Sequence, residues 1–183
     1  MQARKPTPEE LADAVNRTIP DVIAPGLRIL FCGINPGVYS GAVGHHFARP
    51  GNRFWPALHK AELTPRQFSP FEDQELLTLG YGITNVVERT TAAAAELSAE
   101  ELAEGGQRLV EKVLHYHPRI LAVLGISAYR TAFNKPKAIL GPQPERIGDT
   151  VVWVLPNPSG LNAHYRIEHL VTWFREVNAA AGA

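Results

Sequence analysis

Stretches of consecutive apolar residues divide the chain into a regular pattern of strands and helices. Three of them, at 28–32, 120–125 and 151–155, are continuous rather than alternating, and a shorter one lies at 83–86. Continuous hydrophobicity over a short run is typical of strands that are buried on both faces of a sheet. Because helical segments separate these strands, the pattern predicts a three-layer α/β/α sandwich around a central, mostly parallel sheet.

Capping residues mark where two of the helices begin. Thr7 with Glu10, and Ser98 with Glu101, form the Ser/Thr-x-x-Glu pattern in which each residue caps the main chain of the other. Elsewhere, Gly, Pro and Asn mark the boundaries between elements. The predicted helices span about 8–17, 52–61, 72–79, 98–116, 127–133 and 167–179.

The longest predicted helix, 98–116, is expected to pack one side against the sheet and to be weakened in its middle by Gly105 and Gly106. Residues 134–150 are rich in Pro, Gly and charge, which predicts a surface loop with a short edge strand near Arg146. With 183 residues and 45% hydrophobic content, the chain can bury the core of one domain covering 1–183. The expected apolar face of the long helix consists of Leu102, Leu109, Val113 and Leu114.

Two turn-rich segments directly follow strands of this pattern. Gly-Ile-Asn-Pro-Gly at 33–37 follows the first strand, and Pro-Asn-Pro-Ser-Gly-Leu-Asn at 156–162 follows the last. If those two strands are parallel neighbours, both segments emerge at the same edge of the sheet, where open α/β folds bind ligands. Each segment alone is an ordinary turn sequence, but together they predict a single cleft.

The side chains of these two loops suggest a chemistry for the cleft. Gly33 and Gly37 allow the main chain to approach a ligand closely. Asn35, which lies between them, presents a neutral amide. An amide can position a water molecule but is a poor base. In the second loop, the exposed apolar side chain of Leu161 can act as a wedge between stacked bases.

The charge distribution is compatible with a nucleic-acid partner, although the formal net charge is zero. Residues 22–61 contain no Asp or Glu, whereas residues 62–112 hold ten acidic residues against four Lys or Arg. The positive region coincides with the first motif, as a surface that faces phosphates requires. Chance clustering in a neutral protein is the alternative interpretation.

The chain offers little for a metal or a disulfide. Cys32 is the single cysteine and lies in an apolar strand, which favours a buried hydrophobic role. His45 and His46 are adjacent and have no evident third ligand, so phosphate or groove contact is favoured over metal binding. No apolar stretch approaches about 18 residues, so neither export nor a membrane span is indicated and the expected location is cytoplasmic.

Over residues 27–178 the chain resembles the uracil-DNA glycosylase superfamily, and most closely its mismatch-specific uracil/thymine branch. The resemblance rests on the two motifs above and on Phe-Ala-Arg-Pro-Gly-Asn-Arg-Phe-Trp at 47–55, in the same order and separation. It implies that Asn35 orients the attacking water and that Phe47 stacks on the flipped pyrimidine. Phe47 lies in a polar loop, which independently favours a stacking platform over burial.

The resemblance also implies roles for the flanking residues. The wedge and the contact to the orphaned base would come from Gly160, Leu161 and Asn162. The DNA backbone would be contacted by Arg49, Arg53, His164 and Arg166. Glu88 is the candidate carboxylate that assists Asn35, with a solvent-facing partner of Arg89 as its alternative role. The base would be bound by Ile34, Gly37, Tyr39, Ser40, Asn85 and Asn157.

Three departures from the family pattern bear on substrate choice. Asn162 stands where relatives carry Ser followed by Arg, and Asn85 stands where some relatives have Lys. The first motif has no Asp and the second does not open with His, which argues against the fast branch that accepts only uracil. Because Asn162 stands in place of that Ser-Arg pair, the orphaned guanine lacks an obvious arginine partner.

The expected activity is that of a monofunctional DNA glycosylase. It would flip and excise uracil, with thymine or modified pyrimidines as further substrates, where the base is mispaired with guanine in duplex DNA. No metal or cofactor is expected, no membrane is involved and a monomer is expected. Two alternatives stay open: a hydrolase of free nucleosides, and a non-catalytic module that binds damaged DNA.

Overall fold

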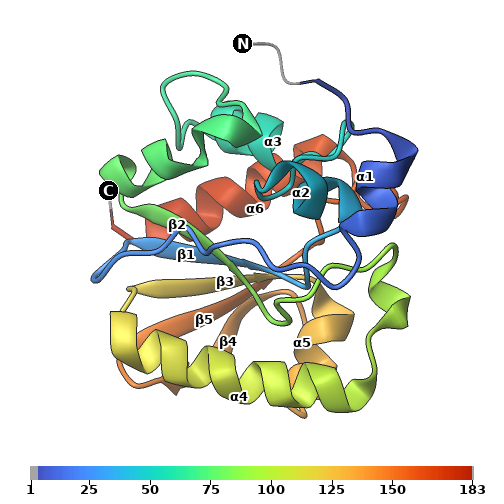
Figure 1. Cartoon of the computed structure of the whole chain (residues 1–183). Helices are drawn as coiled ribbons and strands as arrows, with labels where there is room; N and C mark the ends of the chain where they lie inside the picture. Colours follow the sequence, from blue (N-terminus) through green and yellow to red (C-terminus); the bar gives the residue numbers. More distant parts are fainter. Residues whose placement is uncertain (1–3, 183) are drawn as a thin grey trace.

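The computed structural model describes residues 4–182, which form a five-stranded sheet in the order β2-β1-β3-β5-β4 (Figure 1). Four strands are parallel: β1 (Ile29–Gly33), β2 (Tyr81–Asn85), β3 (Ile120–Leu124) and β5 (Thr150–Leu155). β4 (Gly141–Ile147) runs antiparallel to β5 at one edge. The predicted mostly parallel α/β/α sandwich is confirmed.

Helices cover both faces of this sheet. α3 (Phe54–Lys60) and α6 (Ile167–Ala180) lie on one face, and α4 (Ala99–Tyr116) and α5 (Ile126–Ala132) lie on the other (Figure 1). Every residue of β1, β2 and β3 is buried, because alternate side chains enter the two layers. One layer includes Ile29, Phe31, Phe54, Leu58 and Phe174, and the other includes Leu30, Cys32, Leu109, Val113 and Tyr129.

The expectation that the first and last apolar strands are neighbours is wrong. β3 lies between β1 and β5, with Ile120 paired to Ile29 on one side and to Val151 on the other. The central position of β3, with a strand on either side, agrees with its sequence, because all five of its residues are apolar. The strands nevertheless run in the same direction, so the loops after β1 and β5 still leave the sheet at one edge.

The first helix is shorter than predicted. α1 (Pro8–Asp13) begins with the expected capping box, in which Thr7 and Glu10 cap each other. It ends before the predicted limit at residue 17, because residues 14–17 form a turn in which Asn16 takes a left-handed conformation with φ of 62°. The N–H of Asn16 donates to the carbonyl oxygen of Thr90 at 3.0 Å, so the turn makes a tertiary contact.

The expectations for α4 are confirmed in its start and wrong for Leu114. Ser98 forms the predicted capping box, but Leu114 is 47% exposed instead of facing the sheet. Gly105 and Gly106 mark close packing against neighbouring carbonyl groups. A Cβ atom at Gly105 would lie 2.3 Å from the Val86 oxygen, and one at Gly106 would meet a similar contact.

The remaining differences concern short elements. α2 (Val38–Val43) and the one-turn helix η2 (Ala94–Glu96) were not predicted, and the segment predicted as a helix at 72–79 is the 3-10 helix η1 (Pro70–Leu79). β4 is longer than the edge strand expected near Arg146. Within residues 4–182, no helix is both long and apolar enough to cross a membrane.

Candidate active site

A cavity of about 530 Å³ opens at the carboxyl edge of the sheet. Its lining contains all of the first motif, 33–37, and also Asn157 and Leu161 from the loop that follows β5. Phe47 from the third motif and Asn85 at the end of β2 complete this part of the wall. The volume is that of a small-molecule site, and two loops far apart in sequence share it.

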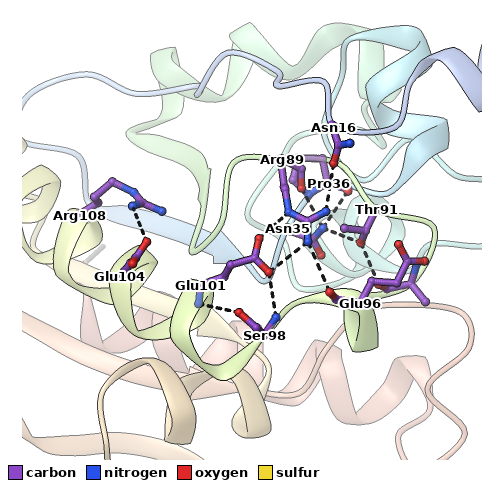
Figure 2. Close-up of polar contacts among 11 residues, drawn as sticks. Asn16, Asn35, Pro36, Arg89, Thr91, Glu96, Ser98, Glu101, Glu104 and Arg108 are labelled. Carbon is purple, nitrogen blue, oxygen red and sulfur yellow. Dashed lines mark hydrogen bonds and ion pairs between the residues drawn. The ribbon is translucent and has the colours of Figure 1, made fainter.

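The side-chain amide of Asn35 is held in one orientation. Its nitrogen Nδ2 donates to the Arg89 carbonyl at 3.0 Å, to Thr91 Oγ1 at 2.8 Å and to the Pro36 carbonyl at 3.3 Å (Figure 2). Thr91 Oγ1 donates its own hydrogen to the Ala93 carbonyl, so it faces Asn35 as an acceptor. All these partners accept, which assigns the NH₂ group to them, and among residues 4–182 no donor to the amide oxygen is found.

The segment that holds Asn35 is itself anchored by the turn after α1 and by the start of α4. Arg89 Nε lies 2.6 Å from Glu101 Oε1, and its Nη1 donates to Asn16 Oδ1 at 3.1 Å (Figure 2). A hydrogen bond from Arg89, followed by one from the Ser98 main chain, lowers the pKa of Glu101 to about 2. The hydroxyl of Thr90 donates to a carbonyl in the turn after α1. The turn after α1 and the start of α4 therefore both hold the segment that binds Asn35.

Phe47 forms one wall of the cavity. It has a left-handed main chain with φ of 52°, and its ring stacks on Phe54 with centroids 4.3 Å apart and planes 30° apart. Gly33 leaves room beside this ring, because a Cβ atom there would lie 3.2 Å from Phe47 Cζ and 2.5 Å from Asn85 Oδ1. The half-buried ring thus rests on the core with one side toward the cavity, as a stacking platform requires.

The loop after β5 presents Leu161 at the rim of the cavity, with 75% of the residue exposed. Asn157 Oδ1 accepts from the Ser159 N–H at 2.9 Å, and Asn162 Nδ2 donates to the Asn157 carbonyl at 3.1 Å. Gly160 passes close to another loop, where a Cβ atom would lie 2.6 Å from the Gly51 oxygen. The loop is internally braced while its one large apolar side chain faces outward.

Comparison with known proteins identifies the family of the chain. A sequence model of the uracil DNA glycosylase superfamily matches residues 20–181. The chain belongs to the uracil-DNA glycosylase superfamily. This membership implies a hydrolase that cleaves the N-glycosidic bond of a base in DNA. The fold is also that of a candidate uracil DNA glycosylase from Methanosarcina acetivorans, with a TM-score of 0.54 and 22% identity over 89% of this chain and 98% of that one.

For this glycosylase, the structure corrects the expectation that Arg53 faces the DNA backbone. Arg53 points into the loop after β5, and its Nη2 donates to the Asn162 carbonyl at 3.0 Å. Its main-chain N–H donates to the Pro158 carbonyl at 3.0 Å. Arg53 therefore holds the Leu161 loop in place. Its guanidinium group donates to four carbonyl oxygens in all, those of Pro158, Ser159, Asn162 and Tyr165.

The two adjacent histidines are also turned inward, against the expectation of phosphate or groove contact. His45 Nδ1 lies 2.9 Å from Asp73 Oδ2, and His46 is only 2% exposed. His46 Nε2 lies 2.7 Å from the Pro20 carbonyl. The basic stretch of sequence therefore supplies fewer free cations to the DNA side than its composition suggested.

Glu88 lies outside the cavity lining, so the structure argues against its expected role beside Asn35. It is exposed, and its Oε1 lies 3.7 Å from Lys112 Nζ. Its expected alternative partner, Arg89, pairs with Glu101 instead. Among residues 4–182, those that line the cavity include no Asp or Glu, and no group of three His, Cys, Asp or Glu could hold a metal ion.

The other expected site residues divide into two groups. Ile34, Gly37, Tyr39, Ser40 and Arg49 line the cavity, Arg49 as an exposed side chain at its rim. His164 and Arg166 are exposed beyond the Leu161 loop and do not line the cavity. Both ends of the Asn162 side chain are used within its own loop, since its Oδ1 accepts from the His164 N–H.

Sequence reasoning missed Thr91, which both lines the cavity and binds the Asn35 amide. It follows the end of β2 at Asn85 by six residues and has no motif of its own. A signal does exist, because Thr90 and Thr91 interrupt a segment that is otherwise apolar or charged. Leu11 and Ile19, from the N-terminal part, also line the cavity and were not expected there.

Proposed function

We propose that this protein is a monofunctional glycosylase that removes uracil mispaired with guanine from duplex DNA, with thymine and modified pyrimidines as further substrates. The proposal rests mainly on Asn35, whose amide nitrogen is fully occupied by acceptors while its oxygen is free to orient water at a cavity. Membership of the superfamily supports it. The mismatch preference comes from the resemblance of the motifs.

Entry of the base into the cavity requires that the nucleotide leave the stack. Unstacking costs a few kcal/mol and least for a mispaired base, so the cost itself favours mismatches. Leu161 is placed to fill the vacated space, because it is exposed at the rim on a braced loop. Phe47 then offers its ring to the face of the flipped base.

Cleavage of the N-glycosidic bond leaves positive charge on the sugar and negative charge on the departing base. The main-chain N–H groups of Ile34 and Gly37, on either side of Asn35, are the candidate donors for the base oxygen. Asn35 directs water at the sugar carbon without removing its proton beforehand. Since no carboxylate of the described chain lines the cavity, we expect slow turnover.

A strand-cleavage assay tests the proposal. A labelled duplex with uracil opposite guanine is incubated with the protein and then treated with hot alkali, which breaks the strand at an abasic site. Cleaved strand supports a glycosylase, and a gel shift without cleavage indicates a binding module. The absence of both cleavage and gel shift indicates a hydrolase of free nucleosides. Uracil opposite adenine, single strands and thymine opposite guanine define the substrate range.

Two variants test the assignment within the cavity. Asn35→Ala is expected to lower the single-turnover rate by about 100-fold while duplex binding stays nearly unchanged, because water is no longer oriented. Glu88→Gln serves as the matched control, since this carboxylate lies outside the cavity lining. A parent-like rate for Asn35→Ala would refute the assignment. A large loss of rate for Glu88→Gln would instead support Glu88 as the carboxylate that assists Asn35.

A further inference from the structure

The chain before β1 forms an arm, residues 7–22, that supplies part of the cavity wall. The arm contains α1, which lies beside α2 (Figure 1). It ends where Val22 pairs antiparallel with Ile83 of β2, with N···O distances of 2.9 and 2.8 Å. Leu11 and Ile19 of the arm line the cavity. The superfamily model matches the chain from residue 20 onward, so most of this arm precedes the matched segment.

Thr90 joins the arm to the rest of the active site. Its main-chain N–H donates to the Arg17 carbonyl at 2.8 Å, and its carbonyl accepts from the Asn16 N–H at 3.0 Å. Its hydroxyl donates to the Ala14 carbonyl, and both Thr90 and Ala14 are fully buried. All of the polar groups of Thr90, in the main chain and in the side chain, are therefore bound by the arm.

The neighbours of Thr90 on either side hold the Asn35 amide. The Arg89 carbonyl and Thr91 Oγ1 accept from Asn35 Nδ2 at 3.0 and 2.8 Å (Figure 2). The main-chain N–H of Thr91 also donates to the Pro36 carbonyl at 3.2 Å. A displacement of Thr90 therefore moves two acceptors of the amide together, because one rigid peptide unit on each side links it to them.

Close packing limits movement at this junction. A Cβ atom on Gly41 of α2 would lie 2.5 Å from Thr90 Cγ2 and 3.3 Å from the Ala14 oxygen. Nearer to β2, the arm is held again by Asp21, whose Oδ2 lies 2.5 Å from Lys112 Nζ in α4. The arm is thus fixed at two places, and a rigid support of this kind keeps a site in its productive geometry.

We propose that the arm is a working part of the active site and that Thr90 is the positioning residue through which it orients the Asn35 amide. The inference rests on the proposed function, because this orientation matters only where Asn35 directs water at a sugar carbon. A misplacement of about 1 Å in such a group lowers the rate by about 100-fold. Thr90 is buried and does not line the cavity, so it acts on the rate of cleavage and not on the binding of DNA.

The first test compares two substitutions of Thr90 in single-turnover excision of uracil opposite guanine. Thr90→Val keeps the size and branching of the side chain and removes the hydroxyl, so the maximal rate is expected to fall about tenfold while the dissociation constant for the duplex stays within about twofold. The Ala14 carbonyl keeps a hydrogen bond from the Arg17 N–H at 3.2 Å, so no buried acceptor is left without a donor. Thr90→Ser retains the hydroxyl and is expected to stay within about threefold of the parent.

Thr18→Val is the matched control, because it makes the same chemical change at an exposed position of the arm that does not line the cavity. This control is expected to excise uracil at the parent rate. A parent-like rate for Thr90→Val overturns the inference alone, and so does a loss in Thr90→Ser or Thr18→Val equal to that in Thr90→Val. Failure of the parent protein to excise uracil overturns the proposed function, and the inference with it.

The second test asks whether Thr90 acts through Asn35. In the Asn35→Ala background no amide remains to be oriented, so Thr90→Val is expected to lower the residual rate by less than about twofold. A further loss of about tenfold in the double variant would mean that the substitution loosens the site in general, and it overturns the inference.

A third measurement needs no variant. In the parent protein, the main-chain N–H groups of Asn16 and Thr90 are expected to exchange with solvent deuterium at least about 100-fold more slowly than in an unstructured peptide, because each donates or is held within the junction. Exchange at the rate of an unstructured peptide overturns the inference.

Discussion

Replacing Arg53 by Met isolates the contribution of the guanidinium group that holds the Leu161 loop. The Arg53 side chain is partly buried, and Met can fill much of the same space. The main-chain hydrogen bond from Arg53 to Pro158 is retained in the variant. The change therefore removes only the side-chain donors to the carbonyl oxygens of Pro158, Ser159, Asn162 and Tyr165.

The magnitude follows from these contacts. A hydrogen bond from a charged donor contributes about 1.5–3 kcal/mol, but such bonds are not additive and carbonyl groups in a surface loop regain water. We take about 3 kcal/mol for the whole set, which corresponds to a factor of about 100 in the equilibrium constant between the docked and the undocked loop. Leu161 is carried on this loop, so base flipping loses its wedge whenever the loop is undocked.

The assay compares single-turnover excision of uracil from duplex and from single-stranded DNA. The duplex rate of Arg53→Met is expected to fall by tens of fold, whereas the single-strand rate stays within about threefold because no base needs to be displaced from a helix. Arg166→Met is the matched control, since Arg166 is exposed beyond the loop and is expected to affect only salt-dependent affinity. Equal losses on both substrates, or equal effects of the two variants, would refute the reasoning.

Four further outcomes are expected. Leu161→Ala lowers excision from duplex far more than from single strands and leaves the melting temperature nearly unchanged, because the side chain is exposed. Gly105→Ala destabilises the fold by about 2 kcal/mol in denaturant unfolding, since its Cβ would meet a carbonyl oxygen at 2.3 Å. Glu101→Ala slows excision without weakening duplex binding, and in the parent the rate shows no titration of Glu101 near neutral pH because its pKa is about 2. The pKa of His46 is lowered in the folded protein, so the unfolded chain takes up a proton at a higher pH than the folded one. The free energy of unfolding is therefore greatest above the usual histidine range and declines as the pH falls. Calorimetry is expected to find a smaller decline in His46→Phe.

Much of the architecture was predictable because its signals are local. Five-residue apolar runs specify buried strands, and the capping boxes at Thr7 and Ser98 mark helix starts through contacts only three residues apart. The turn motifs carry their own Gly and Pro. Once strands are parallel, the loops after them share an edge, which is why the cavity could be predicted even though the place of β3 between β1 and β5 could not.

The charged residues were less predictable, because a sequence shows the charge and not its partner. Arg53 and His46 lie in a stretch without acidic residues, which suggested a surface facing phosphates. Both instead donate to main-chain carbonyl groups, of Pro158 and its neighbours in one case and of Pro20 in the other. Carbonyl groups are present in every residue, so no composition pattern identifies those that will bind a cation or an imidazole.

The two amides of the cavity follow one principle. Asn35 is oriented by partners that only accept from it, and Asn85 is oriented by a ring nitrogen that also accepts, so both NH₂ groups are engaged and both oxygens are left for other partners. Arg89 and Glu101 lie behind this layer and pair with each other away from the cavity. Fixed dipoles act on developing charge without reorganising, but they cannot take up a proton. Such a site should therefore gain selectivity at the expense of rate.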